Sequence, residues 1–126
     1  MKMSFEKIPL ESETELESLI IKNIEVIEEG LNLISHQFVT GAGRIDILCS
    51  DADDRLTVIE LKVKESDRVL LQALKYFDWV NENVLAIKQM FPEAEDVDAN
   101  KIPRLILIAP NFSEDLTKVV KCPRNL

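Results

Sequence analysis

The fold is decided by residues 43–62, which read GRIDILCSDADDRLTVIELK. Two runs rich in apolar and β-branched residues begin in this stretch, at 44–50 and 56–64, and the polar turn 51–55 lies between them. Such runs around a polar turn are typical of an antiparallel hairpin. Residues 31–40 form a similar run that ends in the glycine turn 41–43. Together they predict a three-stranded antiparallel meander.

The turn between the second and third strands sets two carboxylates face to face. If the turn is centred on Asp53, Asp46 pairs with Glu60, and regular alternation puts Asp46 on the same face as Leu48. Paired β-carbons lie about 5 Å apart, so the two charges repel unless a cation lies between them. Because Mg²⁺ is commonly held by one or two carboxylates, waters and a substrate phosphate, the pair predicts a metal site for Mg²⁺ or Mn²⁺.

Lys62 shares a face with Glu60 and can orient a water nucleophile or stabilise developing charge. Arg44, at the start of the second strand, can contact a phosphate near the metal. These residues point to metal-assisted phosphodiester hydrolysis. The alternatives are ordinary surface ion pairs for Arg44 and for the Glu-x-Lys tripeptide, which is common by chance.

A helix is predicted before the meander, beginning at Ser12 with a capping box, loosening near Asn23 and ending at Gly30. On this helix Glu13 points most nearly toward the apolar stripe, whereas Glu15 and Glu17 fall roughly 110° and 90° from it, so Glu13 can supply a further acid to the site. The alternative is a first-turn acid that only stabilises the helix dipole.

A long helix is predicted after the meander, from Ser66 or Asp67 to about Lys88. Gln72 and Tyr76 are four residues apart and share one face, from which they can reach a phosphate or base. The alternative for Tyr76 is core packing. An acidic loop (91–100), a buried strand (104–109) and a last helix (114–121) complete the order αβββαβα. We expect one α/β (α+β) domain over residues 1–126, with the last strand parallel to the third.

The composition excludes several other classes of protein. Hydrophobic residues make up 46% of the 126 residues and charged residues 30%, which is typical of a globular domain. No apolar run approaches the roughly 18 residues that span a bilayer, and no secretory signal opens the chain, so we expect a cytoplasmic protein. Cys49 and Cys122 are expected to be reduced. The net charge of −8 argues against tight non-specific binding to nucleic acid but not against a metal-dependent enzyme.

Most of the chain resembles the nuclease domain of the PD-(D/E)xK superfamily, and above all the C-terminal nuclease domain of NucS-type endonucleases. The matching segments are Ser12-Glu13-x-x-Leu16, 43–48 (GRIDIL), 58–62 (VIELK) and Gln72-x3-Tyr76, with a looser match at 105–113. The resemblance implies a restriction-endonuclease-like core that cuts DNA with Mg²⁺ or Mn²⁺. It assigns these roles to Glu13, Asp46, Glu60 and Lys62 at the catalytic centre, and to Gln72 and Tyr76 as assisting residues.

The resemblance also implies DNA as the partner, with single-stranded, branched and mismatched forms as candidates. NucS-type enzymes carry an N-terminal DNA-binding domain for which this chain has no room, so we expect tight binding to DNA to depend on a partner subunit, a homodimer or a larger parent protein. Lys64, Arg68 and Lys75 are candidates for contacts to the DNA backbone. The competing hypotheses are a non-catalytic module that keeps the nuclease fold for docking or assembly, and a purely structural domain.

Overall fold

A computed structural model describes residues 13–62 and 68–108, with only the backbone given for Glu13 and Val69. Its elements are α1 (Glu13–Lys22), η1 (Ile24–Val26), β1 (Asn32–Thr40), β2 (Gly43–Ser50), β3 (Leu56–Leu61), α2 (Arg68–Glu82), α3 (Val84–Met90), η2 (Pro92–Ala94) and β4 (Arg104–Ile108). The strands form one sheet in the order β1-β2-β3-β4. β1–β2 and β2–β3 are antiparallel and β3–β4 is parallel, which confirms the predicted meander and crossover.

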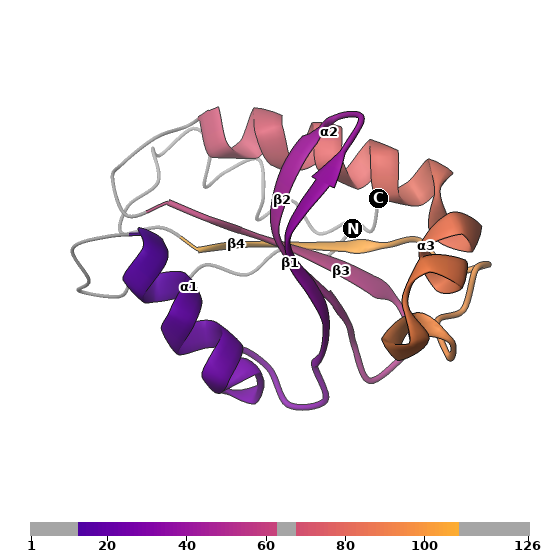
Figure 1. The fold of residues 1–126 in the computed structure, drawn as a ribbon, viewed down its shortest axis with the longest axis horizontal. Helices are drawn as coiled ribbons and strands as arrows, with labels where there is room; N and C mark the ends of the chain where they lie inside the picture. Colours follow the sequence, from indigo (N-terminus) through magenta and orange to yellow (C-terminus); the bar gives the residue numbers. More distant parts are fainter. Residues whose placement is uncertain (1–12, 63–67, 109–126) are drawn as a thin grey trace, which may run out of the picture.

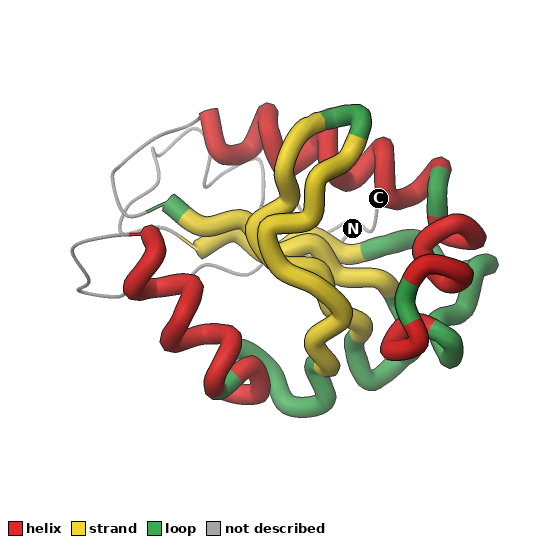
Figure 2. Tube along the Cα trace, in the orientation of Figure 1, coloured by secondary structure: helices red, strands yellow, loops and turns green. Residues whose placement is uncertain are grey.

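The sheet lies between α1 on one face and α2 with α3 on the other (Figures 1 and 2). Two apolar clusters fill the layers. One joins the inner face of α2 and α3 to the sheet through residues such as Ala73, Val80 and Leu105, and the other joins α1 to the opposite face through Leu16 and Ile106. None of the helices in the described ranges is long and apolar enough to cross a bilayer.

Two helices end earlier than the sequence predicts, each at an asparagine. The predicted helix 66–88 is two helices, because Asn83 leaves the helical conformation between α2 and α3. The Asn83 side-chain amide donates to the Trp79 carbonyl oxygen at 2.7 Å. Asn23, at the predicted loosening of the first helix, donates to Leu19 O at 3.4 Å in the same way. Such side-chain bonds to the residue four positions earlier compete with the regular helix.

Several predicted features lie outside the described residues. They are the Ser12 and Ser66 or Asp67 helix starts, residues 63–64 of the third strand, Lys64 as a DNA contact, Ala109 at the end of the last strand, Cys122 and the helix 114–121. The remaining boundaries of the strands agree with the prediction to within one residue.

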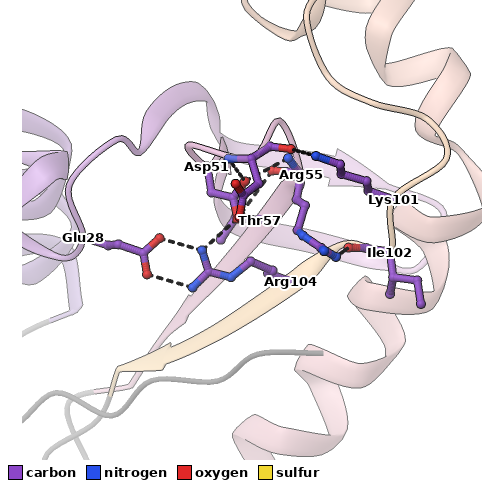
Figure 3. A network of polar contacts seen from close by, with 8 residues as sticks. Glu28, Asp51, Arg55, Thr57, Lys101, Ile102 and Arg104 are labelled. Carbon is purple, nitrogen blue, oxygen red and sulfur yellow. Dashed lines mark hydrogen bonds and ion pairs between the residues drawn. The ribbon is translucent and has the colours of Figure 1, made fainter. Parts of the chain in front are cut away.

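A buried ionic network holds the end of the sheet where β2 turns into β3 (Figure 3). Arg104 makes a two-pronged ion pair with Glu28, with N···O distances of 2.6 and 2.8 Å, and donates to Asp51 at 2.9 Å. The other Asp51 oxygen accepts the backbone N–H groups of Asp53 and Arg55, both at 2.9 Å. Burial tends to raise the pKa of Asp51, but these hydrogen bonds and the Arg104 charge outweigh it and lower that pKa. The network joins β4, the β2–β3 turn and the segment before β1.

Candidate active site

β2 and β3 separate at the position of the predicted carboxylate pair. Their pairing runs from Ser50–Leu56 to Ile47–Ile59 and stops there, which confirms the predicted register. β3 remains with β4, because the Lys62 N–H donates to Ile108 O at 2.8 Å. In Figure 1 the free end of the β1–β2 hairpin extends toward α2. We call the place where the two strands diverge the fork.

Asp46 and Glu60 form the first residue pair beyond the last ladder pair, and each carboxylate binds the backbone of the opposite strand. Glu60 Oε2 accepts the Asp46 N–H at 3.0 Å, and Asp46 Oδ2 accepts the Leu61 N–H at 2.9 Å. These reciprocal bonds fix both side chains at the fork. Glu60 is buried, with 3% of its surface exposed, whereas Asp46 is half-buried.

The expected alternation along β2 does not hold through Asp46. Ile45 packs in the α2-side cluster, as Leu48 does, whereas Ile47 packs in the α1-side cluster. The prediction that regular alternation puts Asp46 on the same face of β2 as Leu48 is therefore wrong. The interruption occurs beside a kink in β1, where Gln37 has a φ of +50° in the middle of the strand.

Asp46 lines a groove of about 400 Å³ whose other walls come from α1, β1, β2 and β3. The lining residues are Thr14, Glu17, Gln37, Arg44, Asp46 and Leu61. Arg44 is exposed, so its guanidinium is available to a ligand of the groove. The predicted candidates Arg44 and Asp46 therefore share one concave surface.

Tyr76 reaches the site from α2. Its ring lies so close to Gly43 that a β-carbon there would come within 3.0 Å of the phenol oxygen. Burial and, next, the charges of Glu60 and Asp46 raise the pKa of Tyr76, although Arg44 opposes the shift. The phenol is therefore protonated at neutral pH and can donate a hydrogen bond. Gln72, one turn earlier on α2, is exposed.

The remaining predicted residues are placed less fully. Lys62 follows β3 directly after the fork and is half-buried. Glu13 begins α1, but its side chain lies outside what the structure describes, so its predicted role is untested. Within residues 13–62 and 68–108, no group of three or more His, Cys, Asp or Glu side chains is arranged to hold a metal ion. Asp46 and Glu60 are the two carboxylates at the fork.

Sequence reasoning missed Glu17 and Gln37. The predicted helix rotation put Glu17 well off the apolar stripe, yet Glu17 lines the groove on the α1 side. The Gln37 amide donates a hydrogen bond to the Glu17 carboxylate. A polar residue in a strand gives no signal of a left-handed backbone, so Gln37 could not have been found from its residue type.

Comparison with known proteins places this geometry in context. A family model described as the endonuclease NucS C-terminal domain matches residues 12–115. Endonuclease NucS of Methanocaldococcus jannaschii is 30% identical over 118 residues, which cover 93% of this chain and 40% of that protein. Endonuclease NucS of Streptomyces griseus is 30% identical over 90 residues, covering 65% of this chain and 40% of its own. The chain thus spans less than half the length of these relatives.

Solved structures agree with the sequence matches. The crystal structure of a repair endonuclease from Pyrococcus abyssi superposes with a TM-score of 0.68 at 28% identity, over 94% of this chain and 46% of that one. The structure of an EndoMS complex with dsDNA gives a TM-score of 0.68 at 26% identity, over 92% of this chain and 43% of that one. The mixed sheet and its flanking helices are therefore a known arrangement.

Proposed function

The chain belongs to the family of the endonuclease NucS C-terminal domain, and from this membership we propose that it hydrolyses DNA phosphodiester bonds with the help of a divalent metal ion. The fork has the features that such a reaction needs. Asp46 and Arg44 line the groove, Glu60 is bonded to the Asp46 backbone across the fork, and Lys62 directly follows β3. The Tyr76 phenol lies beside Gly43 at the start of β2. The order of these residues fits the PD-(D/E)xK pattern, in which we assign Asp46 as the acid of the first strand and Glu60 and Lys62 as the residues of the second.

The observation that carries the proposal is the reciprocal bonding of Asp46 and Glu60 across the fork. Each bond occupies one carboxylate oxygen and fixes the orientation of the group, at 3.0 Å for Glu60 and 2.9 Å for Asp46. Two oriented carboxylates on neighbouring strands suit Mg²⁺ or Mn²⁺, which take oxygen ligands from one or two carboxylates and complete their shell with waters and substrate phosphates. We therefore assign Asp46 and Glu60 as the residues that would hold the ion.

The bound ion would supply Lewis-acid stabilisation of phosphate charge and a water of lowered pKa. The chain's own residues would then position the substrate. The Lys62 ammonium, directly beyond the fork, orients the attacking water and offsets the charge that develops on the phosphate. Arg44, from β2, and the Tyr76 phenol, from α2, donate to phosphate oxygens. Gln72 and Glu13 are assigned supporting roles on α2 and α1.

Cleavage assays with wild type and Asp46→Asn test the proposal. Both proteins are incubated with Mg²⁺ or Mn²⁺ and with double-stranded, single-stranded, branched and mismatched DNA. We expect metal-dependent cutting of at least one substrate by the wild type, and a loss of at least a hundredfold in Asp46→Asn, because removal of an electrostatic catalytic group typically costs that much. Asparagine retains an oxygen that can accept the Leu61 N–H, so the fork keeps its fold.

Asp96→Asn is the matched control, because it removes an exposed carboxylate from the loop after η2. It is expected to cut as the wild type does. Metal binding by calorimetry without cleavage of any substrate would reject the enzyme and favour a non-catalytic module of the same fold. The absence of metal binding and of cleavage would leave a structural domain.

A further inference from the structure

Gln37 stands across from Asp46 in the sheet. The pairs His36–Ile47 and Phe38–Ile45 flank it on β1 and β2, so the position between them on β2 is Asp46. The edge strand therefore places a carboxamide beside the residue that we assign to the metal. Gln37 is also exposed and lines the groove with Asp46 and Arg44.

The backbone of Gln37 is in the left-handed region, with a φ of +50°. The other non-glycine residue with positive φ among the described residues is Asp54, which lies in a tight turn where this conformation is common for aspartate. Gln37 lies inside a strand, not in a turn. A left-handed backbone is strained there for an L-residue with a long side chain. Strained residues cluster at functional sites, where the surrounding structure holds them in place.

The Gln37 side chain is oriented by α1. Its Nε2 donates to the Glu17 carboxylate, which uses one of the two N–H donors of the amide. The second N–H can donate to a phosphate oxygen. Glu17 and Asp46 make this side of the groove acidic, and the neutral Gln37 amide can donate to a phosphate there, beside Arg44, without adding another negative charge.

We infer that Gln37 is a substrate-binding residue, which contacts a phosphate of the DNA strand on the α1 side of Asp46, and that Glu17 is the positioning residue that orients its amide. The inference rests on the proposed function for the identity of the substrate. It goes beyond it by extending the binding surface from the fork to the edge strand β1 and to α1. The left-handed backbone of Gln37 then serves to present the amide at the groove.

Gln37→Gly separates this role from a structural one. Glycine adopts positive φ without strain, so the melting temperature is expected to stay the same or rise. The dissociation constant for a fluorescein-labelled duplex, measured by anisotropy with Ca²⁺ in place of Mg²⁺, is expected to rise about tenfold or more, because a hydrogen bond to a charged group is lost. Gln89→Ala removes an exposed carboxamide from α3 and is the control, with unchanged affinity expected.

Two variants of Glu17 test the positioning role. Glu17→Leu and Glu17→Gln both remove the charge, but only glutamine keeps an acceptor for the Gln37 amide. We expect Glu17→Gln to bind the duplex more tightly than Glu17→Leu, and this difference to vanish in a Gln37→Gly background. Equal affinity of the two Glu17 variants would overturn the positioning role.

Wild-type affinity and cleavage in Gln37→Gly would overturn the DNA contact, as would a loss of affinity that merely follows a fall in melting temperature. A wild-type chain that binds the duplex without cutting it contradicts the proposed function alone, and a weaker Gln37→Gly complex then still supports the contact. A wild-type chain that does not bind the duplex overturns the inference.

Discussion

Replacement of Arg104 by methionine is expected to lower the free energy of unfolding far more than a substitution on the surface. The Arg104 guanidinium lies 2.9 Å from Asp51 and 2.6 Å from Glu28, and the side chains of Arg104 and Asp51 are 6% and 3% exposed. Methionine fills much of the same volume but leaves the Asp51 carboxylate buried without its cation. Removing one partner of a buried pair costs about 3–5 kcal/mol, a large share of the roughly 5–15 kcal/mol that stabilise a typical domain.

Two features of the network adjust this magnitude. Glu28 is 28% exposed, so its carboxylate can turn toward water and contributes less to the loss. The buried Arg104 Nε has no hydrogen-bond partner among the described residues, so methionine also removes one unsatisfied donor. The main cost is therefore that of Asp51. For a chain of 126 residues, 1 kcal/mol corresponds to about 4 °C, and we expect the melting temperature to fall by about 12–20 °C.

Urea unfolding followed by circular dichroism measures the loss, and Asp51→Asn in the Arg104→Met background tests its cause. Asparagine keeps the oxygen that accepts the Asp53 and Arg55 N–H bonds but carries no charge, so most of the lost stability is expected to return. Arg55→Met is the control, because that guanidinium donates to Ile102 O at an exposed position and its loss costs about 0.5–1.5 kcal/mol.

The pH dependence of the Arg104→Met effect is a second readout. The folded-state pKa of Asp51 lies below its ordinary value of 3.8, so its contribution is present above that pH and is lost as pH falls through the folded pKa. Without the Arg104 charge and hydrogen bond this pKa is higher, and the variant regains relative stability as Asp51 protonates. The destabilisation is thus expected to be smaller near pH 4 than near pH 7. A loss below about 1 kcal/mol, or one independent of pH, refutes the reasoning.

Three further outcomes follow from the same structure. Gly43→Ala is expected to cost about 1–3 kcal/mol in urea unfolding, because φ is +132° and the new β-carbon meets the Tyr76 ring at 3.0 Å; an unchanged midpoint contradicts this. Tyr76→Phe keeps the ring and is expected to lower cleavage about tenfold or more with little change in melting temperature, whereas equal loss of both would make the phenol structural. Burial raises the pKa of the Cys49 thiol from 9.0 to about 12. In a Cys122→Ser background a thiol reagent should therefore label only the urea-unfolded protein, and the free energy of unfolding should fall as pH rises from about 9 toward 12.

The arrangement of the strands could be predicted from local signals. The polar turn at 51–55 fixed the register that sets Asp46 across from Glu60, and the apolar run at 104–109 required a buried strand, which a crossover helix makes parallel to β3. These features depend on short-range periodicity and on the handedness of connections. The breaks at Asn23 and Asn83 depend instead on side-chain amides that compete with backbone bonds, and only the first was expected.

Two features that no sequence pattern revealed, the Arg104 ionic network and the kink at Gln37, are made by long-range contacts. Arg104 and Glu28 are 76 residues apart along the chain, and although Arg104 opens the predicted buried strand, nothing in the sequence marks Glu28 or Asp51 as its partner. Likewise the kink at Gln37 reflects the balance among β1, β2 and α1, not the propensity of a glutamine. Contacts between residues so distant in sequence form only after the sheet has brought their segments together.

The fork joins the stability of the sheet to its chemistry. Where β2 leaves β3, the N–H groups of Asp46 and Leu61 lose ladder partners, and buried backbone donors must be paired. The carboxylates of Glu60 and Asp46 supply those acceptors, so the residues assigned to the metal also hold the strands apart at a fixed spacing. Substitution by alanine would remove both functions at once. Asparagine and glutamine keep an acceptor oxygen and remove the charge, and only these variants separate a catalytic defect from a collapsed fork.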